Sequence, residues 1–354
     1  MINLTEIIRV RPRRKFDSRT LRLDMAERQP FFETPVFEDF ISNLSQLDFL
    51  AYPTADQEDL VKSLLKEYLK VNEVYDLICA AGSDSILKDS IHVFAAASEK
   101  KVLLVRPSFP MYEIYCKSFG VDAIVHQMSS AALDCNKFIA DITEDVGLII
   151  IANPGSPFGE YLPLSVMEEI IRKAANVGCN VIIDEAYIEF VSEGKRYMLP
   201  MQKNVIKIGT LSKAFGGAGA RFGWAIASYE NIQLLRTVAL TYPISSATYK
   251  FAEFALKNIN QMYEYTTDVR RERQLLTDRL RSSGINILDS EINTVHIESC
   301  ALSEQMMERF VTANDVLMKQ RDTASTPIAI PDSPSSAWYR LSIAPGLTDI
   351  LFKG

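Results

Sequence analysis

Short apolar runs alternate with amphipathic segments between residues 75 and 212. Six runs have the length of strands, and several are apolar on both faces: YDLICAAG (75–82), KVLLVRP (101–107), VDAIVHQ (121–127), GLIIIANP (147–154), NVIIDEAY (180–187) and VIKIGTLS (205–212). Between them, apolar residues recur at helical spacing in 84–100, 110–120 and 165–178. Strands that are apolar on both faces belong to a sheet covered on both sides, so the pattern predicts a parallel α/β sheet with helical crossovers.

The pattern changes on either side of this region. Residues 56–71 carry leucines along one face, which predicts an amphipathic helix packed on the sheet. A long helical stretch (248–280) precedes two strand-like pieces, NTVHIES and WYRLSIA, and the composition of IPDSPSSA (330–337) is typical of a loop. We therefore expect an N-terminal arm (1–30), a large α/β domain (31–238) and a small α+β domain (239–354).

Composition narrows the class of protein. With 354 residues, 47% of them hydrophobic and 23% charged, the chain fits an ordinary two-domain globular protein. Its net charge of −7 favours neither nucleic acid nor an anionic membrane, and no apolar run has the length of a membrane span or of a signal peptide core. The five cysteines are widely spaced and form no CxxC pair. We expect a cytoplasmic protein with reduced thiols, no metal site, and no nucleic-acid or membrane partner.

Small polar residues follow the first predicted strand. Gly82-Ser83-Asp84-Ser85 opens a helix, where backbone N–H groups and hydroxyls suit an anion such as phosphate. An ordinary helix cap explains Ser83 or Asp84 equally well. No GK[ST] follows and no second glycine has the GxGxxG spacing, so nucleotide binding is disfavoured.

Charged residues end two other predicted strands. Asp184 ends a very apolar run, and the next strand ends with Thr210, Ser212 and Lys213. Alone, a buried carboxylate is explained by a helix cap or an internal ion pair. The carboxyl ends of parallel strands share one edge of the sheet, however, and a lysine beside a buried aspartate has a chemical use there. Lys213 could form a Schiff base with a carbonyl cofactor while Asp184 keeps a ring nitrogen protonated.

The stretch after Lys213 supplies the third component of such a site. Residues 216–219 are small, which predicts a turn whose backbone passes close to a ligand and presents Arg221 to it. Arg221 could hold a phosphate together with Ser83, Ser85 and Ser212. Pyridoxal 5'-phosphate is the cofactor that needs an amine, an anion beside its ring nitrogen and a phosphate site together.

The stretches IIDEAYIEF (182–190) and TLSKAFGGAGARFGW (210–224) resemble the pyridoxal-phosphate aminotransferases of fold type I, most closely the histidinol-phosphate aminotransferases. The resemblance implies a large domain with a mostly parallel seven-stranded sheet and a smaller α+β C-terminal domain. It also implies that Lys213 carries the Schiff base and the proton that leaves the substrate Cα. Asp184 matches the partner of the ring nitrogen, and Tyr187 matches the donor to the phenolic oxygen.

The same resemblance implies further contacts. Arg221 and Ser212, with the turn Ser83-Asp84-Ser85, match the phosphate ligands, and Ser85 stands where an acidic residue is common. Phe109 in RPSFPMY matches the aromatic residue that stacks on the ring, although a core phenylalanine is the alternative. Arg340 matches the arginine that binds the substrate α-carboxylate through two parallel hydrogen bonds. Tyr52 matches a tyrosine that reaches the phosphate of the neighbouring subunit, which implies a homodimer with shared sites.

Three features depart from the family pattern. Ser156, in Asn153-Pro154-Gly155-Ser156-Pro157-Phe158-Gly159, takes the place of the asparagine that bonds the phenolic oxygen. Ala26, in LDMAERQPFF, takes the place of another asparagine. The chain ends soon after Arg340, and an insertion lies around 323–337, so we expect a shortened small domain without the family's last helix.

Three functions remain open from these residues. The leading hypothesis is an aminotransferase that moves an amino group from a donor, with glutamate expected, to a small carbonyl acceptor. The alternative is a decarboxylase of a phospho-amino acid, because threonine-phosphate decarboxylases share the fold, the lysine and a similar Tyr339-Arg340 pair. A silent regulatory protein is disfavoured, since it has no need of Lys213. Candidate ligands for a substrate phosphate are Arg28, Lys319 and Arg321.

Overall fold

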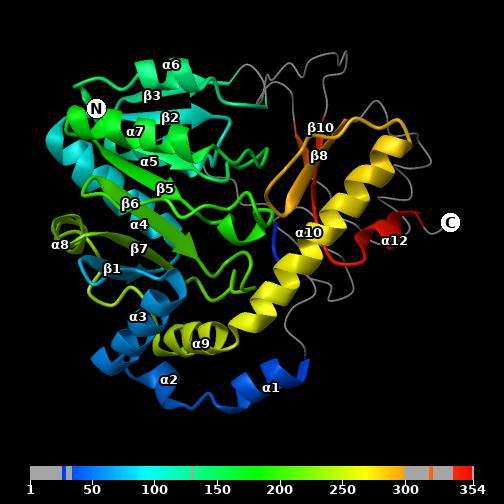
Figure 1. Ribbon diagram of the computed structural model, residues 1–354. Coiled ribbons are helices and arrows are strands. Elements are labelled where there is room, and N and C mark those ends of the chain that lie inside the picture. The colour runs from blue at the N-terminus through cyan, green and yellow to red at the C-terminus, as the bar shows by residue number, and fades with distance from the viewer. Residues whose placement is uncertain (1–25, 29–33, 129–130, 299–318, 322–337, 353–354) are drawn as a thin grey trace.

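Seven strands form the central sheet of the computed structural model, which describes residues 26–28, 34–128, 131–298, 319–321 and 338–352 (Figure 1). The order across the sheet is β1-β7-β6-β5-β4-β2-β3. The strands are Tyr75–Ala80 (β1), Lys101–Arg106 (β2), Ala123–Gln127 (β3), Val146–Ala152 (β4), Asn180–Asp184 (β5), Val205–Thr210 (β6) and Gly223–Ser228 (β7). Strand β7 runs antiparallel to β1 and β6, and the other pairs are parallel. The mostly parallel α/β sheet is confirmed, and the six predicted runs coincide with β1 to β6.

Helices cover both faces of this sheet. On one face, α4 (Ser83–Phe94), α5 (Met111–Phe119) and α8 (Tyr229–Arg236) pack on strand residues such as Leu104 and Ile150. On the other face, α6 (Cys135–Ala140) and α7 (Leu164–Asn176) pack on Leu103 and Ile149. Alternate residues of one strand therefore enter opposite cores, which is why consecutive residues in the middle of these strands are apolar.

The apolar pattern of the sequence does not single out β7. Its six residues, GWAIAS, are all buried, but the strand starts directly after the turn that carries Arg221. Its first residue, Gly223, leaves no room for a side chain, because an added Cβ would lie 2.2 Å from the backbone nitrogen of Ser83. Gly223 allows the first residue of β7 to contact the start of α4. A glycine also adds nothing to a pattern of apolar residues, so it does not signal where the strand begins.

A third core joins the sheet to the C-terminal part of the chain. Helices α3 (Ala55–Leu69) and α9 (Ser246–Lys257) pack together. Their side chains share one hydrophobic cluster with β1, β7 and α10 (Ile259–Ser282). Because this cluster is continuous from Val61 to Leu351, the domain boundary near residue 238 stays a prediction.

The C-terminal part contains a small antiparallel sheet of order β8-β10-β9. Helix α10 runs alongside β8 and β10 in Figure 1. The strands are Thr294–Glu298 (β8), Lys319–Arg321 (β9) and Trp338–Ser342 (β10). The described ranges also contain the short α-helices α1 (Thr34–Ser42), α2 (Leu47–Leu50) and α12 (Leu347–Phe352). Glu272 of α10 accepts hydrogen bonds from the backbone nitrogens of Gly346 (2.9 Å) and Thr348 (2.5 Å), which fixes the start of α12. The expectation that no helix follows Arg340 is therefore wrong.

Several expectations concern residues outside the described ranges: most of the arm at 1–30, the insertion at 323–337 with its loop, and Cys300. The four described cysteines are free thiols. Within the described ranges no helix is long and apolar enough to cross a membrane, and no group of histidine, cysteine and acidic side chains could hold a metal ion.

Candidate active site

The carboxyl ends of the parallel strands form the edge at which the candidate residues gather. Asp184 is the last residue of β5 and Thr210 the last of β6. Gly223 of β7 pairs with Thr210 on one side and with Ala80, the last residue of β1, on the other. In Figure 1 the arrowheads of β5 and β6 point toward the side where β8, β10 and α10 lie. A ligand of a parallel sheet binds beyond this edge.

The Asp184 carboxyl is buried at the end of β5 and holds two hydrogen bonds. The hydroxyl of Tyr112 donates to its Oδ2 (2.7 Å), and the backbone nitrogen of Ala186 donates to its Oδ1 (3.0 Å). Burial raises the pKa of Asp184, while both donors and the charge of Lys213 act in the opposite direction. The carboxyl is thus oriented by fixed donors and is ready to face a cationic group.

Tyr112 is a site residue that the sequence pattern did not identify. It lies in the first turn of α5, where it looked like part of the apolar face of a helix. Its ring contacts Phe109 edge-to-face, with ring centroids 5.7 Å apart. Phe109 is 39% exposed, so it is not the core phenylalanine that was the alternative. Its position beside the Asp184–Tyr112 pair suits an aromatic wall over a ligand.

Lys213 follows β6 and lies close to the residues that follow β5. Its Nζ is 5.3 Å from the centroid of the Tyr187 ring. The backbone before it is fixed by Thr210, whose Oγ1 donates to the carbonyl of Phe222 (2.9 Å) and accepts from the backbone nitrogen of Ser212 (3.1 Å). The lysine, the tyrosine and the aspartate therefore share one corner of the site.

Arg221 lies over the start of α4. A Cβ added at Gly82 would be 2.6 Å from its Nη2 and 3.2 Å from its Cζ. Its Nη1 donates to Ser212 Oγ (3.4 Å) and to the carbonyl of Ala218 (3.3 Å). Arg221 and Gly82 both have positive φ angles, 57° and 82°, so two left-handed residues bring a guanidinium and a helix N-terminus together.

The first turn of α4 separates the residues that were predicted to act together. The backbone nitrogen of Ser83 lies against β7, and Asp84 has a buried Oδ1 with no partner among the described residues. Ser85 lines a different hollow, beside Leu240 and Pro243. The backbone nitrogen of Ser83 therefore lies beside Gly223, the charge of Asp84 acts on Tyr112, and Ser85 lines the hollow beside the 235–243 segment.

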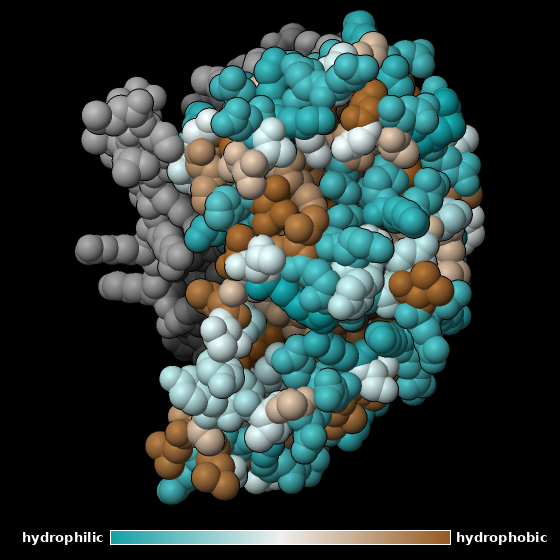
Figure 2. All heavy atoms as spheres, turned by 90° about the vertical axis from the view of Figure 1, so that its left-hand side faces the viewer, coloured by the Kyte–Doolittle hydropathy of each residue, from teal (hydrophilic) through white to brown (hydrophobic). Residues whose placement is uncertain are grey.

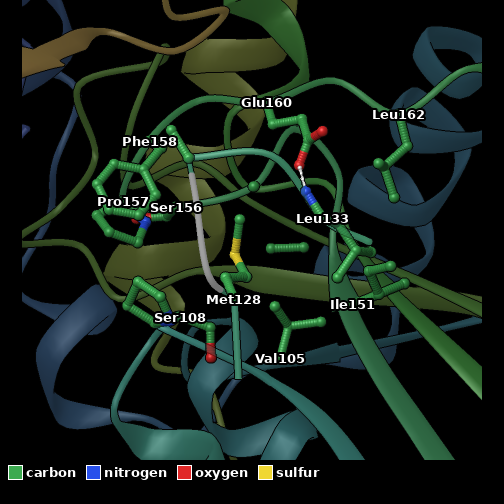
Figure 3. Close-up of a pocket in the computed structure, with 14 residues that line it drawn as sticks. Val105, Ser108, Met128, Leu133, Ile151, Ser156, Pro157, Phe158, Glu160 and Leu162 are labelled. Carbon is green, nitrogen blue, oxygen red and sulfur yellow. Dashed lines mark hydrogen bonds between the residues drawn. The ribbon is translucent and has the colours of Figure 1, made fainter. Parts of the chain in front are cut away.

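The loop after β4 forms a wall beside the site. Asn153 is buried and fixed by Tyr197 and by the backbone nitrogen of Leu162. Ser156 lines a mostly apolar hollow with Ser108, Met128 and Phe158, all shown in Figure 3. Ser156 thus lies at the same sheet edge, and the hollow beside it carries no cationic side chain among its lining residues.

Arg340 approaches from the small sheet. It is buried, and in the register of β10 it lies opposite His296 of β8 and Lys319 of β9. The His296 ring contacts Phe158 of the loop after β4, with ring centroids 5.1 Å apart. These contacts connect the strand of Arg340 to the wall that contains Ser156.

Tyr52 lies apart from these residues on the surface. It is 75% exposed, and its ring stacks on that of Tyr242 at 4.4 Å between centroids. Its place in the fold is therefore open to contact from outside the chain.

The residues present fit pyridoxal 5'-phosphate. A guanidinium over a helix N-terminus is a phosphate site, and the lack of a side chain at Gly82 lets the Arg221 guanidinium lie against the start of the helix. The Asp184 carboxyl, with an exposed aromatic ring beside its donor Tyr112, suits a ring nitrogen under a stacked face. Lys213 lies in the same corner, where its amine could reach an aldehyde.

Comparison with known proteins agrees with this fit. The sequence profile of the family "Aminotransferase class I and II" matches residues 32–351. A histidinol-phosphate aminotransferase of Clostridium novyi (strain NT) is 29% identical over 280 residues, 78% of this chain and 77% of the relative. One of Lactococcus lactis subsp. cremoris (strain MG1363) is 31% identical over 266 residues, 74% of this chain and 71% of the relative.

Solved structures share the fold. The histidinol-phosphate aminotransferase of Sinorhizobium meliloti, in complex with pyridoxal-5'-phosphate, superposes with a TM-score of 0.75 at 20% identity, covering 93% of this chain and 88% of the other. The L-threonine-O-3-phosphate decarboxylase of Porphyromonas gingivalis gives a TM-score of 0.74 at 16% identity, covering 94% and 97%. The profile match covers most of the chain, residues 32–351. The residues at the sheet edge independently fit the cofactor that this family uses. The chain belongs to the aminotransferase class I and II family and is a pyridoxal 5'-phosphate-dependent aminotransferase, similar to the histidinol-phosphate aminotransferases.

Proposed function

We propose that this enzyme moves an amino group from glutamate to a small phosphorylated carbonyl compound of the histidinol-phosphate type. The observation that carries the proposal is the joint placement of Asp184, Lys213 and Arg221 at one sheet edge, with Arg340 approaching from the small sheet. The relatives' names supply the acceptor class, and the buried arginine supports an α-carboxylate donor.

Four side chains would hold the cofactor. Arg221 and the N-terminus of α4 would bind the phosphate, and Asp184, oriented by Tyr112, would keep the ring nitrogen protonated. Tyr187 would donate to the phenolic oxygen, and Ser156 would face the same side from the loop after β4. When bound, the cofactor supplies a conjugated ring that spreads negative charge from the substrate Cα and carries the amino group between the two substrates.

Two side chains would act on the substrate. Arg340 would bind the α-carboxylate through two parallel hydrogen bonds, a geometry that lysine does not reproduce. Arg340 is buried, and an ion pair formed away from bulk water is screened less than one on the surface. The Lys213 Nζ would take the proton from the substrate Cα and would deliver it to C4′ of the cofactor.

The homodimer is part of this proposal. Tyr52 stands on the surface among exposed apolar side chains of two segments. They are Leu47 (69% exposed), Phe49 (70%), Leu50 (78%), Leu240 (71%) and Tyr242 (54%). Figure 2 shows hydrophobic residues gathered at the lower margin of the molecule, the level at which α1 and α2 lie in Figure 1. An apolar patch of this kind is typical of an interface. We propose that two subunits bind through this patch and that Tyr52 then contacts the cofactor phosphate of the second subunit.

The deciding experiment is a spectral titration with L-glutamate. The protein should show a band at about 400 nm that borohydride abolishes, and glutamate should convert it to the band of the amino form. Lys213→Ala should lack the band, while Lys207→Ala, which removes a lysine of β6 paired with Glu185, should keep it.

The alternative function gives a different result in the same assay. A decarboxylase of a phospho-amino acid would leave the band unchanged with glutamate and would release CO₂ from phosphothreonine or phosphoserine. That result would overturn the proposed transamination and leave the cofactor assignment intact.

A further inference from the structure

Residues 26–28 form a short strap, here named the 26–28 strap, that joins the small sheet to the backbone after Lys213. The backbone nitrogen of Ala26 donates to Ser342 Oγ (3.0 Å), at the end of β10. The side-chain nitrogen of Asn293, just before β8, donates to the carbonyl of Ala26 (3.1 Å). Ala26 and Asn293 are buried, so this end of the strap is part of the interior beside the strand of Arg340.

The other end of the strap is the Arg28 side chain. Its Nη1 donates to the carbonyl of Ala214 (3.2 Å), and its Nη2 donates to the carbonyl of Gln261 in α10 (3.3 Å). Its guanidinium lies 4.4 Å from the centroid of the Tyr265 ring. Arg28 is only 6% exposed, and burial lowers its pKa. Two outer nitrogens and one face of the group are therefore engaged by the protein itself.

This geometry changes the role that the sequence suggested for Arg28. A substrate phosphate would compete with two main-chain carbonyls and an aromatic face for the same guanidinium. The carbonyl of Ala214 belongs to the residue directly after Lys213. Holding it fixes the peptide plane between Ala214 and Phe215, one residue beyond the lysine. The backbone nitrogens of Leu211, Gly216 and Gly217 donate the hydrogen bonds that hold the rest of this segment.

We propose that Arg28 is a positioning residue for Lys213, and that the 26–28 strap sets the distance between Lys213 and Arg340. The inference rests on the proposed function, in which Lys213 and Arg340 act on one substrate. Ala26 of the strap contacts Ser342, at the end of the strand that contains Arg340. Arg28 contacts the backbone of Ala214, the residue after Lys213, and only one residue separates Ala26 from Arg28. Three residues thereby hold the proton-transferring amine and the carboxylate-binding guanidinium in a fixed relation.

The test compares Arg28→Lys and Arg28→Met with Arg273→Lys. Arg273 is a matched control, because it is also 6% exposed and also donates to two main-chain carbonyls, those of Phe190 and Ile292. Lysine cannot reach both carbonyls from position 28, and methionine keeps only the apolar stem. Both Arg28 variants should speed amide hydrogen exchange in residues 211–217 of the cofactor-free protein by about tenfold relative to Arg273→Lys.

Two further readouts separate positioning from general stability. In the holoenzyme, the Arg28 variants should shift the pH midpoint of the absorbance band and raise KM for glutamate, whereas Arg273→Lys should do neither. Ser342→Ala releases the strap at its other end and should cause a smaller effect in the same direction, even if the Arg28 variants fold poorly.

The proposal is overturned if exchange in 211–217 and the pH midpoint are the same in the Arg28 variants, Ser342→Ala and Arg273→Lys. A wild-type protein without the band would instead refute the proposed function. The exchange comparison on cofactor-free protein distinguishes these two failures.

Discussion

At the scale of single residues, the Asp184–Tyr112 pair decides whether a ring nitrogen meets a charged carboxylate. Burial already raises the pKa of Asp184, and the Tyr112 hydroxyl is one of the groups that oppose this rise. Tyr112→Phe removes that donor and raises the pKa of Asp184 further, which favours the neutral acid. A hydrogen bond to a charged group contributes about 1.5 to 3 kcal/mol, so we expect kcat/KM to fall roughly 10-fold to 100-fold.

The check on this prediction is a comparison of three variants at fixed cofactor concentration. Asp184→Asn should lose more activity than Tyr112→Phe, because it removes the charge itself. Tyr161→Phe, which changes a tyrosine stacked on Tyr197, should retain activity. Equal activity of Tyr112→Phe and wild type would contradict the role assigned to the pair.

Glu189, a residue of the short 3₁₀ turn Ile188–Phe190, gives a pH dependence to stability. Burial raises the pKa of Glu189 from 4.5 to about 7, opposed by the charge of Arg196 and by the hydrogen bond from Tyr68 (2.8 Å). The folded state therefore holds this proton more tightly than the unfolded state does. The contribution of this proton to the free energy of unfolding is fully present below pH 4.5 and is lost as the pH rises to about 7. The free energy of unfolding changes by on the order of 3 kcal/mol over this range.

Glu189→Gln keeps an acceptor for Tyr68 and removes the titration, so the variant should lack this loss and exceed wild type in stability above pH 7. Urea unfolding at several pH values measures the difference. Glu193→Gln is the control, because its side chain is 84% exposed and surface charges contribute little. The same pH slope in Glu189→Gln and wild type would show that burial does not govern this carboxyl.

At the scale of elements, the start of α4 and the turn before β7 form one phosphate cradle. Gly82→Ala places a Cβ 2.6 Å from Arg221 Nη2, at a φ of +82° that strains any L-residue. The guanidinium must then move off the helix N-terminus, and cofactor affinity should fall about 10-fold to 100-fold, the contribution of one charge-assisted hydrogen bond.

Gly284→Ala separates the two effects of that substitution. Its φ is +76° and a Cβ there meets nothing within 4 Å, so it carries the backbone strain of about 1 kcal/mol without the clash. Gly82→Ala should lose at least as much unfolding free energy as Gly284→Ala, and only Gly82→Ala should lose affinity for pyridoxal 5'-phosphate by equilibrium dialysis. A loss in both variants would attribute the effect to strain elsewhere.

The sequence predicted those helices and strands in which a single pattern of apolar residues extends over the whole segment. Strands β1 to β6 each contain a run of apolar residues, and helices cover both faces of the sheet, so the pattern identified them. The pattern did not predict strand β7, which begins with Gly223, a position where a side chain would collide with the backbone of Ser83. Helix α6 has six residues, too few for a helical period to emerge.

Site residues were predictable where chemistry requires a residue type, as at Asp184, Lys213 and Arg221. Tyr112 was not, because a helical position gives no sign of which carboxyl its hydroxyl reaches. Ser85 was expected beside the phosphate; it lines the hollow beside residues 235–243, and its contact with the phosphate stays a prediction. The strap contact from Arg28 to Ala214 spans 186 residues of sequence, and no local pattern encodes it.

At the scale of the whole molecule, the continuous hydrophobic cluster links the sheet, α3, α9 and α10, so the small sheet is not an isolated unit. The surface, by contrast, exposes six large apolar or aromatic side chains in two segments: Leu47, Phe49, Leu50, Tyr52, Leu240 and Tyr242. Stable homodimer interfaces bury such apolar patches. Leu50→Asp places a charge in this patch and should convert a dimer into monomers in sedimentation experiments, while Leu234→Asp, on an exposed site of α8, should not.

Shared sites make a stronger prediction than dimerisation alone. Tyr52→Phe keeps the ring that stacks on Tyr242 and loses only the hydroxyl, and Lys213→Ala keeps the hydroxyl at position 52 and loses the amine. In a co-expressed hybrid, one site combines Lys213 from the first chain with Tyr52 from the second and is therefore complete, whereas the other site lacks both groups. Activity of the purified hybrid should exceed the mean of the two parent variants. If Tyr52 served only the site of its own chain, no complete site would form, and the hybrid would match that mean.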